Sequence, residues 1–422
     1  MDKPLKTKQN ILIIGGGIIG LACAHYLIRD GHKVTILERE KIGGAASHGN
    51  CGLLCFSDLI PLCAPGTIVQ ELVKSIKGIS PLYIKPRMDP ALFIWLSRFA
   101  LNCNKGRMDR AAAAKYAFLT YSARLFDRLR GQFSMDCDLE KKGLLMVYKN
   151  KKGFDAYGQT DKYLRPYGMG ARKISREELL HMEPSLKEDI AGGWLNPADG
   201  SLRPDMLITS WKIHLRQKGV ILKEHCPVTG FIHSGPRSTI TGVRTDQGEF
   251  KADAFILAAG AWTPLTMKQL RLSIPVQPGK GYSITMERPH LIPSRPCSFS
   301  ERKVVATPWK NGYRLGGTME FSGYDNGFTK GRLSKIIAGA GEYLKHPMGH
   351  PVVEEWTGLR PMCSDDMPVI DRAPGRDNLI VATGHGMLGL TLAPGTGKIA
   401  SDMIAGRTPD IDVAPFSMTR FI

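Results

Sequence analysis

The sequence predicts an α/β fold, and three observations support this prediction. The chain opens with a strand–turn–helix–strand unit, its middle is rich in short strands, and it closes with a second strand–loop–helix unit. With 422 residues it is long enough for two or three domains. The order of these elements predicts an α/β core that is interrupted by a second, strand-rich domain.

The first unit lies at the very start of the chain. Residues 10–15 form a short apolar, β-branched run that predicts a buried strand, and residues 18–29 carry an apolar helical face. Gly31 ends this helix, and residues 33–38 predict the next strand. The order strand, helix, strand is that of a βαβ unit.

Three glycines stand between the first strand and the helix with GxGxxG spacing. Gly15 allows a tight turn, Gly17 lets the backbone approach a pyrophosphate, and Gly20 permits close packing of helix on strand. The helix that begins at Ile18 and Ile19 presents free N–H groups and a positive dipole to phosphate. The turn therefore predicts a dinucleotide site.

Glu38 ends the second strand, where its carboxylate is placed to accept hydrogen bonds from an adenosine ribose. Arg39 follows it, and then a run of small residues at 43–47 that includes Ala46 and Ser47. The backbone of such a run can follow a bound ligand closely. At this point both NAD and FAD fit the residues.

A second glycine-rich unit near the C-terminus favours FAD. A strand at residues 378–384 leads through a loop to Pro394, Gly395 and Gly397. We expect a helix from Gly395 to Ala405 that starts beside the flavin pyrimidine and stabilises the negative charge formed there on reduction. An extended FAD reaches from the first unit to such a distant segment.

The middle of the chain carries the other predicted elements. Residues 91–133 predict a mainly helical stretch, residues 143–148 a strand followed by a lysine-rich turn, and residues 204–218 a helix. Further strand patterns lie at residues 220–231, 239–260, 274–286 and 303–320. We predict a discontinuous FAD-binding domain and a substrate-binding domain. The first is formed by residues 1–85, 190–270 and 355–422, and the second by residues 86–189 and 271–354.

The net charge of +18 is the unusual feature of the composition. Hydrophobic residues make up 43% and charged residues 23%, which excludes a disordered chain and a membrane bundle. The charge indicates an anionic partner, which leaves nucleic acid, a membrane surface, an acidic ligand or simply a solvated basic surface. No aromatic RNA-binding motif, zinc finger or helix-turn-helix pattern is present, so we expect no nucleic-acid partner.

Nine scattered cysteines without a CxxC pair predict reduced thiols and no metal site. The first ten residues lack the apolar stretch of a signal peptide. The longest uncharged stretch, residues 378–397, carries five glycines and Pro394, so we expect no spanning helix. These features predict a cytoplasmic protein, with peripheral contact at the inner face of the cytoplasmic membrane as a further expectation.

These motifs resemble those of the D-amino acid oxidase (DAO) superfamily of FAD-dependent oxidoreductases, and the likeness covers nearly the whole chain. The superfamily carries the glycine–acid unit, a small-residue turn such as Ala46–Ser47, and a strand that ends Ala-Ala-Gly-Ala-Trp, here residues 258–262. Pro227 and Val228 match a segment whose valine backbone meets adenine. The resemblance implies a Rossmann-like FAD-binding domain with an interleaved α+β substrate domain on a mixed or antiparallel sheet.

Within the superfamily the sequence is most similar to the bacterial D-amino acid dehydrogenases. The motifs that carry this similarity are residues 63–66, 278–283, 316–320, 356–362 and 384–389. Two segments depart from the pattern: residues 363–368 replace the usual Thr-Pro-Asp-Gly-x-Pro, and residues 390–394 look more like glycine and hydroxyproline oxidising relatives. These departures leave the identity of the substrate undecided, whereas they do not affect the predicted fold.

The resemblance implies that FAD is bound without a covalent link, because Cys363 lies close to, but not at, the position of the linking cysteine in sarcosine oxidases. The implied cofactor-binding residues are Gly15, Gly17, Ile18, Ile19, Gly20, Glu38, Arg39, Ala46, Ser47, Gly52, Leu53, Val228, Ala259, Gly260, Trp262, Gly384, Gly386, Met387, Leu388, Gly389, Leu390 and Thr391.

Arg360 is implied to hold the substrate carboxylate, since related oxidases place their carboxylate-binding arginine in this motif and a planar guanidinium binds carboxylate through two hydrogen bonds. His385 is implied to lie near the flavin, where it tunes the ring or shapes the pocket.

Tyr282 is expected either beside the catalytic groups or in sheet packing. Asp365–Asp366 and Glu354–Glu355 are expected to be solvated or capping carboxylates.

The implied activity is oxidative deamination of D-amino acids to 2-oxo acids and ammonia, with hydride transfer to flavin N5 and a quinone-type electron acceptor. Positioning carries most of the rate, so no dedicated general base is required. One alternative is an oxidase of glycine, sarcosine or a cyclic imino acid such as hydroxyproline that uses oxygen. A remote alternative is a non-catalytic basic flavoprotein or a nucleic-acid-binding protein.

Overall fold

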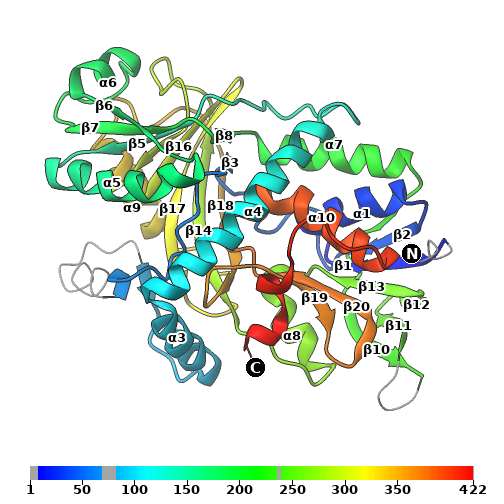
Figure 1. Cartoon of the computed structure of the whole chain (residues 1–422). Helices are drawn as coiled ribbons and strands as arrows, with labels where there is room; N and C mark the ends of the chain where they lie inside the picture. Colours follow the sequence, from blue (N-terminus) through cyan, green and yellow to red (C-terminus); the bar gives the residue numbers. More distant parts are fainter. Residues whose placement is uncertain (1–7, 69–81, 235–238, 422) are drawn as a thin grey trace.

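The computed structural model describes residues 8–68, 82–234 and 239–421. These residues form a six-stranded and a nine-stranded sheet, with helices packed against both (Figure 1). Two small sheets accompany them, one of three strands and one of two. The predicted α/β fold class with a mixed second sheet is confirmed.

The six-stranded sheet has the order β19-β20-β13-β1-β2-β9. Its strands are β1 (Asn10–Ile14), β2 (Lys33–Leu37), β9 (Ile221–Lys223), β13 (Ala254–Leu257), β19 (Val369–Ala373) and β20 (Arg376–Thr383). All neighbours pair in parallel except β19, which is antiparallel to β20. Because β2 and β13 are added on opposite sides of β1, the strand order reverses there, and α/β sheets bind ligands at such a point.

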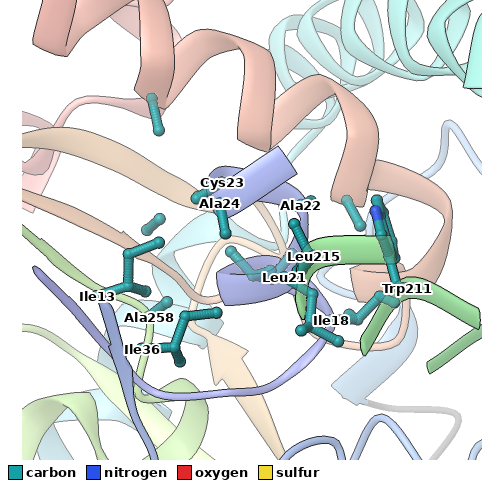
Figure 2. Packing of buried hydrophobic residues seen from close by; sticks show 14 of the residues in the cluster. Ile13, Ile18, Leu21, Ala22, Cys23, Ala24, Ile36, Trp211, Leu215 and Ala258 are labelled. Atoms are coloured by element: carbon teal, nitrogen blue, oxygen red, sulfur yellow. The ribbon is translucent and has the colours of Figure 1, made fainter. Parts of the chain in front are cut away.

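Helices α1 (Ile18–Arg29), α7 (Pro204–Gln217) and α10 (Gly389–Ala405) contribute to the core on one side of this sheet. Leu21 of α1, Ile13 of β1 and Trp211 of α7 belong to one buried cluster (Figure 2). The alternate strand residues, such as Leu12 and Phe255, pack against a second cluster that includes the three-stranded sheet. The sheet is therefore covered on both faces, as a parallel sheet requires.

The nine-stranded sheet has the order β18-β14-β17-β16-β15-β5-β7-β6, and β4 pairs with β17. Its strands are β4 (Leu82–Ile84), β5 (Leu144–Tyr148), β6 (Arg172–Ile174), β7 (Gly192–Asn196), β14 (Val276–Met286), β15 (Cys297–Phe299), β16 (Val304–Trp309), β17 (Gly312–Phe321) and β18 (Val352–Cys363). The long ladder between β14 and β18 is antiparallel and runs from Val276 opposite Cys363 to Met286 opposite Val352.

The remaining elements surround these sheets. The helices are α3 (Pro90–Asn102), α4 (Lys105–Leu129), α5 (Lys151–Leu164), α6 (Arg176–Met182), α8 (Thr263–Lys268) and α9 (Lys330–Gly341). The small sheets consist of β10 (Val228–His233), β11 (Ile240–Thr245) and β12 (Gly248–Lys251), and of β3 (Leu53–Leu54) with β8 (Gly200–Ser201).

Residues 91–133 are mainly helical, as the sequence predicts. They divide into α3 and α4, because the Asn104 side chain accepts a hydrogen bond from the Arg107 N–H and starts a new helix. The lysine-rich segment after residue 148 is predicted as a turn. In the structure Lys149 and Asn150 form a short bend that leads into α5, and the Asn150 side chain caps this helix by accepting from the Gly153 N–H.

Helix α10 begins at Gly389, six residues before the predicted start, so Pro394 lies inside it. A proline in a helix removes one backbone hydrogen bond. The buried Ser122 of α4 bridges the next pair of backbone groups, since its Oγ donates to the Thr391 carbonyl at 2.7 Å and accepts from the Gly395 N–H at 3.2 Å. The inserted side chain satisfies both groups where the proline disturbs the helix.

The predicted domain boundaries stay a prediction. The chain contributes to the two sheets in turn, and β7 and β18 belong to the nine-stranded sheet although residues 190–196 and 355–363 fall in the segments assigned to FAD binding.

Candidate active site

A cavity of about 340 Å³ opens at the carboxyl ends of the parallel strands. Ile14 at the end of β1, Leu37 at the end of β2, Ala258 after β13 and Thr383 at the end of β20 all line it. Its position is where an open α/β sheet binds a nucleotide.

The glycine turn between β1 and α1 has the geometry that the sequence predicts. Gly15 has φ +109°, and a Cβ atom there would lie 2.4 Å from the Ala258 carbonyl oxygen. A Cβ atom at Gly20 would lie 2.0 Å from the Gly15 carbonyl oxygen, so the helix packs directly on the turn. A Cβ atom at Gly17 would meet only the Ser47 Oγ, at 3.3 Å, which leaves its other side for a ligand.

Ser47 and Glu38 contact this turn from outside. Ser47 Oγ accepts a hydrogen bond from the Ile18 N–H at 2.9 Å, and Glu38 accepts from the Gly16 N–H at 2.7 Å and the Glu40 N–H at 3.0 Å. The first turn of α1 contains no acidic residue. The free N–H groups that follow Ile18 are therefore available to an anion.

Arg39 and Trp262 form the wall of the cavity beyond Glu38. The Arg39 guanidinium lies 4.0 Å from the centroid of the Trp262 ring, which is a close cation–π contact. Val228, at the start of β10, lines the same cavity. Arg39 and Trp262 thus contact each other and, together with Val228, form one part of the cavity wall.

The structure brings most of the predicted cofactor-binding residues to the cavity. Those that line it are Gly15, Gly17, Ile18, Ile19, Glu38, Arg39, Ala46, Ser47, Val228, Ala259, Gly260, Trp262, Gly386, Met387, Gly389 and Leu390. Their assignment to FAD itself stays a prediction.

The other six do not line it and have structural contacts. Gly20 packs on the turn, and a Cβ atom at Gly52 would meet the Leu202 carbonyl oxygen. Leu53 pairs with Ser201 in the β3–β8 sheet. A Cβ atom at Gly384 would meet the Cys363 Sγ, Leu388 packs in a buried cluster, and the Thr391 hydroxyl accepts from the Cys55 N–H.

Arg360 lies on β18 and lines the cavity. Its Nη1 donates to the Thr318 carbonyl oxygen at 3.1 Å, and its guanidinium packs on Gly281 of β14. The approach is possible only because residue 281 has no side chain. Strands β17 and β14, which carry Thr318 and Gly281, thus hold the guanidinium in one place.

Thr318 has φ +67°, which is rare for a β-branched residue. The register between β14 and β17 slips nearby, since Lys280 is opposite Glu320 but Tyr282 is opposite Gly317. The extra residue on β17 forms a bulge, and bulges redirect backbone groups beside functional sites. Here the bulge places the Thr318 carbonyl where it orients Arg360.

Burial lowers the pKa of the Arg360 guanidinium, and the nearby Cys51 thiol opposes this effect. An arginine nevertheless keeps its charge in a protein. In the part of the chain that the structure describes, no carboxylate forms an ion pair with Arg360. The site therefore presents a fixed cation that an anionic ligand can neutralise.

His385 lines the cavity and is almost fully buried. Its Nε2 is 2.9 Å from the Thr396 hydroxyl of α10, and burial lowers its pKa to about 3. The imidazole is therefore neutral at physiological pH and is a poor proton acceptor. This geometry suits a residue that shapes the cavity.

Tyr282 is buried but is not among the cavity-lining residues. Its hydroxyl lies 3.4 Å from a Glu320 carboxylate oxygen, and its ring packs on Phe328. It belongs to the cluster beneath α9 and not to the side of β14 that carries Gly281. Of the three catalytic candidates, the structure brings Arg360 and His385 to the cavity but not Tyr282.

The sequence does not predict a site role for Trp356, which lines the cavity, or for Arg314, which binds the cavity-lining Asn50. Trp356 lines the cavity, and its ring packs against Gly49 and Gly358, where a Cβ atom would overlap it at about 2 Å. Arg314 is buried and donates to the His48 and Asn50 carbonyl oxygens, at 2.9 and 2.8 Å. The aromatic residue in the motif at 356–362 and the two glycines are the signals for Trp356, whereas nothing local identifies Arg314.

The carboxylates that were expected to be solvated or capping have specific partners. Glu354 pairs with His48 at 2.8 Å, and Asp365 pairs with Arg420 at 2.7 Å. Asp366 pairs with the buried Lys115 at 3.2 Å and also caps the Leu62 N–H. The three side chains stay partly exposed, with 33% of Glu354, 13% of Asp365 and 10% of Asp366 accessible. Asp366 is a capping carboxylate as expected, whereas the three ion pairs were not part of the expectation. Glu355 is exposed.

Comparisons with known proteins agree with this geometry. The model of the DAO family, described as FAD dependent oxidoreductase, matches residues 10–403. The chain belongs to this family. It is 32% identical to a D-amino acid dehydrogenase of Xanthobacter autotrophicus and 30% identical to one of Vibrio atlanticus. These alignments cover 98% of this chain and 99% and 100% of the relatives.

Proteins with solved structures of this fold are named for varied substrates. A glycine oxidase from Geobacillus kaustophilus matches with a TM-score of 0.78 and 24% identity, over 98% of this chain and 99% of that chain. An L-amino acid deaminase from Proteus myxofaciens matches with a TM-score of 0.73 and 16% identity, over 100% and 95%. At these identities the likeness concerns the fold alone.

The cavity residues fit FAD. The N-termini of α1 and α10 both reach the cavity, and the first turn of neither helix contains an acidic residue. Such helix ends stabilise a pyrophosphate and the charge on a reduced flavin. Gly17 leaves room for a close backbone approach, and Glu38 lines the cavity directly after β2. The protein is therefore an FAD-dependent oxidoreductase.

Two further properties concern the described residues only. None of their helices is both long and apolar enough to cross a membrane. Their nine cysteines are all free thiols, and burial raises the pKa of several of them, including Cys23 and Cys63, each to about 12.

Proposed function

We propose that the protein oxidises D-amino acids to 2-oxo acids and ammonia and passes the electrons to a quinone-type acceptor. The observation that carries this proposal is Arg360, a cavity-lining guanidinium that has no carboxylate partner among the described residues. A substrate carboxylate supplies that partner. The choice of D-amino acids is supported by relatives of about 30% identity that are named D-amino acid dehydrogenase.

Arg360 fixes the position of the substrate. Its contact with the Thr318 carbonyl and its packing on Gly281 remove the rotational freedom of the guanidinium. One hydrogen bond to Thr318 leaves further N–H groups for a carboxylate. Fixing the carboxylate aligns the substrate Cα–H bond and removes much of the entropic barrier to reaction.

The side chains around Arg360 favour a neutral substrate amine. Trp356, Leu359 and Pro361 line the cavity next to it, and an ammonium loses hydration among apolar groups. Bound FAD supplies the acceptor for the hydride that leaves the substrate Cα. The two electrons of the C–H bond leave with the hydride, and the nitrogen lone pair forms the C=N bond of an imino acid.

Protons are handled by water in this proposal. The carboxylates among the described cavity residues are Glu38 and Glu40, which follow β2 of the six-stranded sheet, whereas Arg360 lies on β18 of the nine-stranded sheet. His385 is neutral with its pKa near 3, so it does not act as the base. Water takes the proton of the substrate ammonium before binding and hydrolyses the imino acid afterwards.

The electron acceptor and the location of the protein complete the proposal. A quinone dissolved in a bilayer is accessible to a protein that binds the membrane surface. The net charge of +18 favours anionic lipid, since each basic residue near such a surface adds to the attraction. We therefore place the protein at the inner face of the cytoplasmic membrane as a peripheral enzyme.

Anaerobic reduction of the bound flavin tests the substrate class. We expect several D-amino acids to bleach the visible flavin absorbance, and their L-enantiomers, glycine, sarcosine and the hydroxyproline isomers to bleach it far more slowly. Faster bleaching by glycine, sarcosine or hydroxyproline would overturn the proposal. Under air, stoichiometric hydrogen peroxide during turnover would show an oxidase and exclude the quinone acceptor.

A further inference from the structure

Helix α3 is apolar on both of its faces. Leu92 and Trp95 are buried against the protein, whereas Phe93, Ile94 and Leu101 point to the opposite, exposed side. A helix on the surface of a soluble protein normally carries polar residues on its outer face, and one that is apolar all round is normally buried. Among the residues that the structure describes, none covers the outer face of α3, which is therefore an exposed apolar surface.

The protein holds α3 firmly in place. Asp89 caps its first turn, the Trp95 Nε1–H donates to the Met362 carbonyl oxygen at 2.8 Å, and the Asn102 amide donates to the Ser364 carbonyl oxygen at 3.2 Å. Both contacts are made to β18 or the residue that follows it. The apolar face is thus presented by a fixed helix and not exposed by fraying.

The exposed apolar side chains of the protein are concentrated here. Among the described residues, six of the fifteen large apolar side chains that are exposed lie between residues 83 and 101. We define the α3 surface as Met88, Phe93, Ile94 and Leu101, of which Met88 is 92% and Leu101 66% exposed. Figure 1 shows α3 at the periphery of the molecule. Contiguous apolar residues at such a place mark an interaction site.

The chain segment that contains α3 carries an excess of positive charge. Residues 82–110 contain six basic side chains and two carboxylates. Two of the six are paired within the segment, Arg87 with Asp89 and Lys105 with Asp109, so the excess comes from Lys85, Arg98, Arg107 and Arg110. Arg98 is the one charged residue within α3. An apolar face with a basic rim matches the apolar interior and anionic headgroups of a lipid surface, whereas a second copy of the chain would bring cations against cations.

We propose that the α3 surface docks the protein on an anionic lipid bilayer. With 13 residues, α3 is about 20 Å long at 1.5 Å per residue, which is too short to span a bilayer. It lies in the interface, with Phe93, Ile94 and Leu101 among the acyl chains and the flanking Lys and Arg side chains at the phosphates.

Docking through α3 also orients the catalytic end of the molecule. Trp95 binds Met362, which lies two residues beyond Arg360 on the same strand. A protein docked through α3 therefore holds the Arg360 end of its cavity near the lipid. The orientation of the cavity toward the lipid rests on the proposed function. The lipid binding itself does not, because it is measured without turnover.

Flotation of the purified full-length holoenzyme with vesicles tests the inference. We expect binding to vesicles of phosphatidylcholine mixed with phosphatidylglycerol, weaker binding to phosphatidylcholine alone, and release by added salt. The double variant Phe93→Gln/Leu101→Gln is expected to lose at least tenfold in partition coefficient. The matched control Ile213→Gln/Ile221→Gln, whose side chains are as exposed on α7 and β9, is expected to bind like the wild type.

Activity with a soluble dye acceptor separates this inference from the proposed function. Both double variants are expected to keep wild-type dye-linked activity and bound flavin, which shows that they fold. Equal binding of the Phe93→Gln/Leu101→Gln variant and the wild type, or no binding of the wild type to anionic vesicles, would overturn the docking inference whatever the substrate is. Concentration-dependent association of the wild type that this variant loses would identify a second copy as the occupant and also overturn it.

Discussion

The guanidinium of Arg360 lies directly on the backbone of Gly281, so that a Cβ atom at residue 281 would stand 2.2 Å from Nη1. Gly281 is opposite Gly358 in the β14–β18 ladder, and the two glycines leave the space in which the Arg360 and Trp356 side chains lie. The position of the candidate carboxylate-binding group is thus determined by the absence of side chains on the neighbouring strand.

Replacing Gly281 by alanine is expected to displace Arg360. Loss of a charged hydrogen bond costs about 1.5–3 kcal/mol, so kcat/KM for the preferred amino acid is expected to fall roughly 10- to 100-fold, mainly through KM. Steady-state kinetics with a dye acceptor measures this. The control is Gly331→Ala, where a Cβ atom meets nothing within 4 Å. Unchanged KM in Gly281→Ala would show that Arg360 does not bind the substrate.

Arg360→Lys keeps the positive charge but loses the planar fork. We expect KM to rise roughly 10- to 100-fold while the flavin spectrum and the flavin content stay normal. Arg302→Lys, in a surface ion pair with Glu342, serves as the control. Near-normal kinetics of Arg360→Lys together with a defective Gly281→Ala variant would indicate that the glycine acts through packing alone.

Glu38→Gln tests the predicted nucleotide site. Glu38 accepts from the Gly16 and Glu40 N–H groups, and a glutamine amide cannot accept at both of its ends. We expect the dissociation constant for FAD to rise about 10- to 100-fold, measured from the flavin that remains bound after dialysis. Glu249→Gln on β12, an exposed strand residue, is the control. Full flavin retention in Glu38→Gln would remove Glu38 from the cofactor site.

The pH dependence of activity is expected to lack a contribution from His385. Its pKa is lowered to about 3 by burial, so the side chain stays neutral above pH 5. We expect His385→Gln to change the size of kcat/KM but to leave the shape of its pH profile between pH 6 and 9 unaltered. A limb of the profile that disappears in this variant would show that His385 titrates during catalysis.

Asp199 is expected to make the protein less stable as the pH rises. Burial raises the pKa of this carboxyl to about 7, while the Ser57 N–H and hydroxyl bind it. Between about pH 4 and 7 the folded state holds the proton and the unfolded state does not, so the free energy of unfolding falls with rising pH by on the order of 1 kcal/mol per unit.

Asp199→Asn removes this ionisation, because an amide does not titrate. The asparagine keeps the local hydrogen bonds, since it can accept from the Ser57 N–H and donate to the Ser57 Oγ. The melting temperature of the variant is expected to exceed that of the wild type increasingly as the pH rises from 4 to 8. Thermal denaturation at several pH values measures the difference, with Asp155→Asn on the exposed side of α5 as the control. A constant difference across this range would contradict the raised pKa.

The elements that the sequence predicts well are those determined by local patterns. The helix at Ile18–Arg29 and the strands beside it agree with the structure, because the glycine turn and the apolar periodicity lie within the segment itself. The sequence predicts the start of α10 at Gly395, after Pro394, because a proline is disfavoured inside a helix. Its true start at Gly389 depends on Ser122, which lies far away in the sequence.

The candidate site is likewise predicted only where its residues stand in local motifs. Arg360 and His385 stand in recognisable motifs, and both line the cavity. Arg314 stands in no motif and binds loop carbonyls that lie more than 250 residues before it. The failure of Tyr282 to reach the cavity reflects strand alternation, since its neighbour Gly281 faces Arg360 and successive residues of a strand point to opposite faces.

The residues that line the cavity come from the whole chain, from Ile14 to Leu390, and β13 separates β1 from β20 within one sheet. During synthesis, the glycine turn therefore leaves the ribosome long before the lining residues at the start of α10. The nucleotide pocket is therefore a late product of translation. Premature termination anywhere before α10 is expected to leave a polypeptide that cannot retain its cofactor, even when the first βαβ unit is intact.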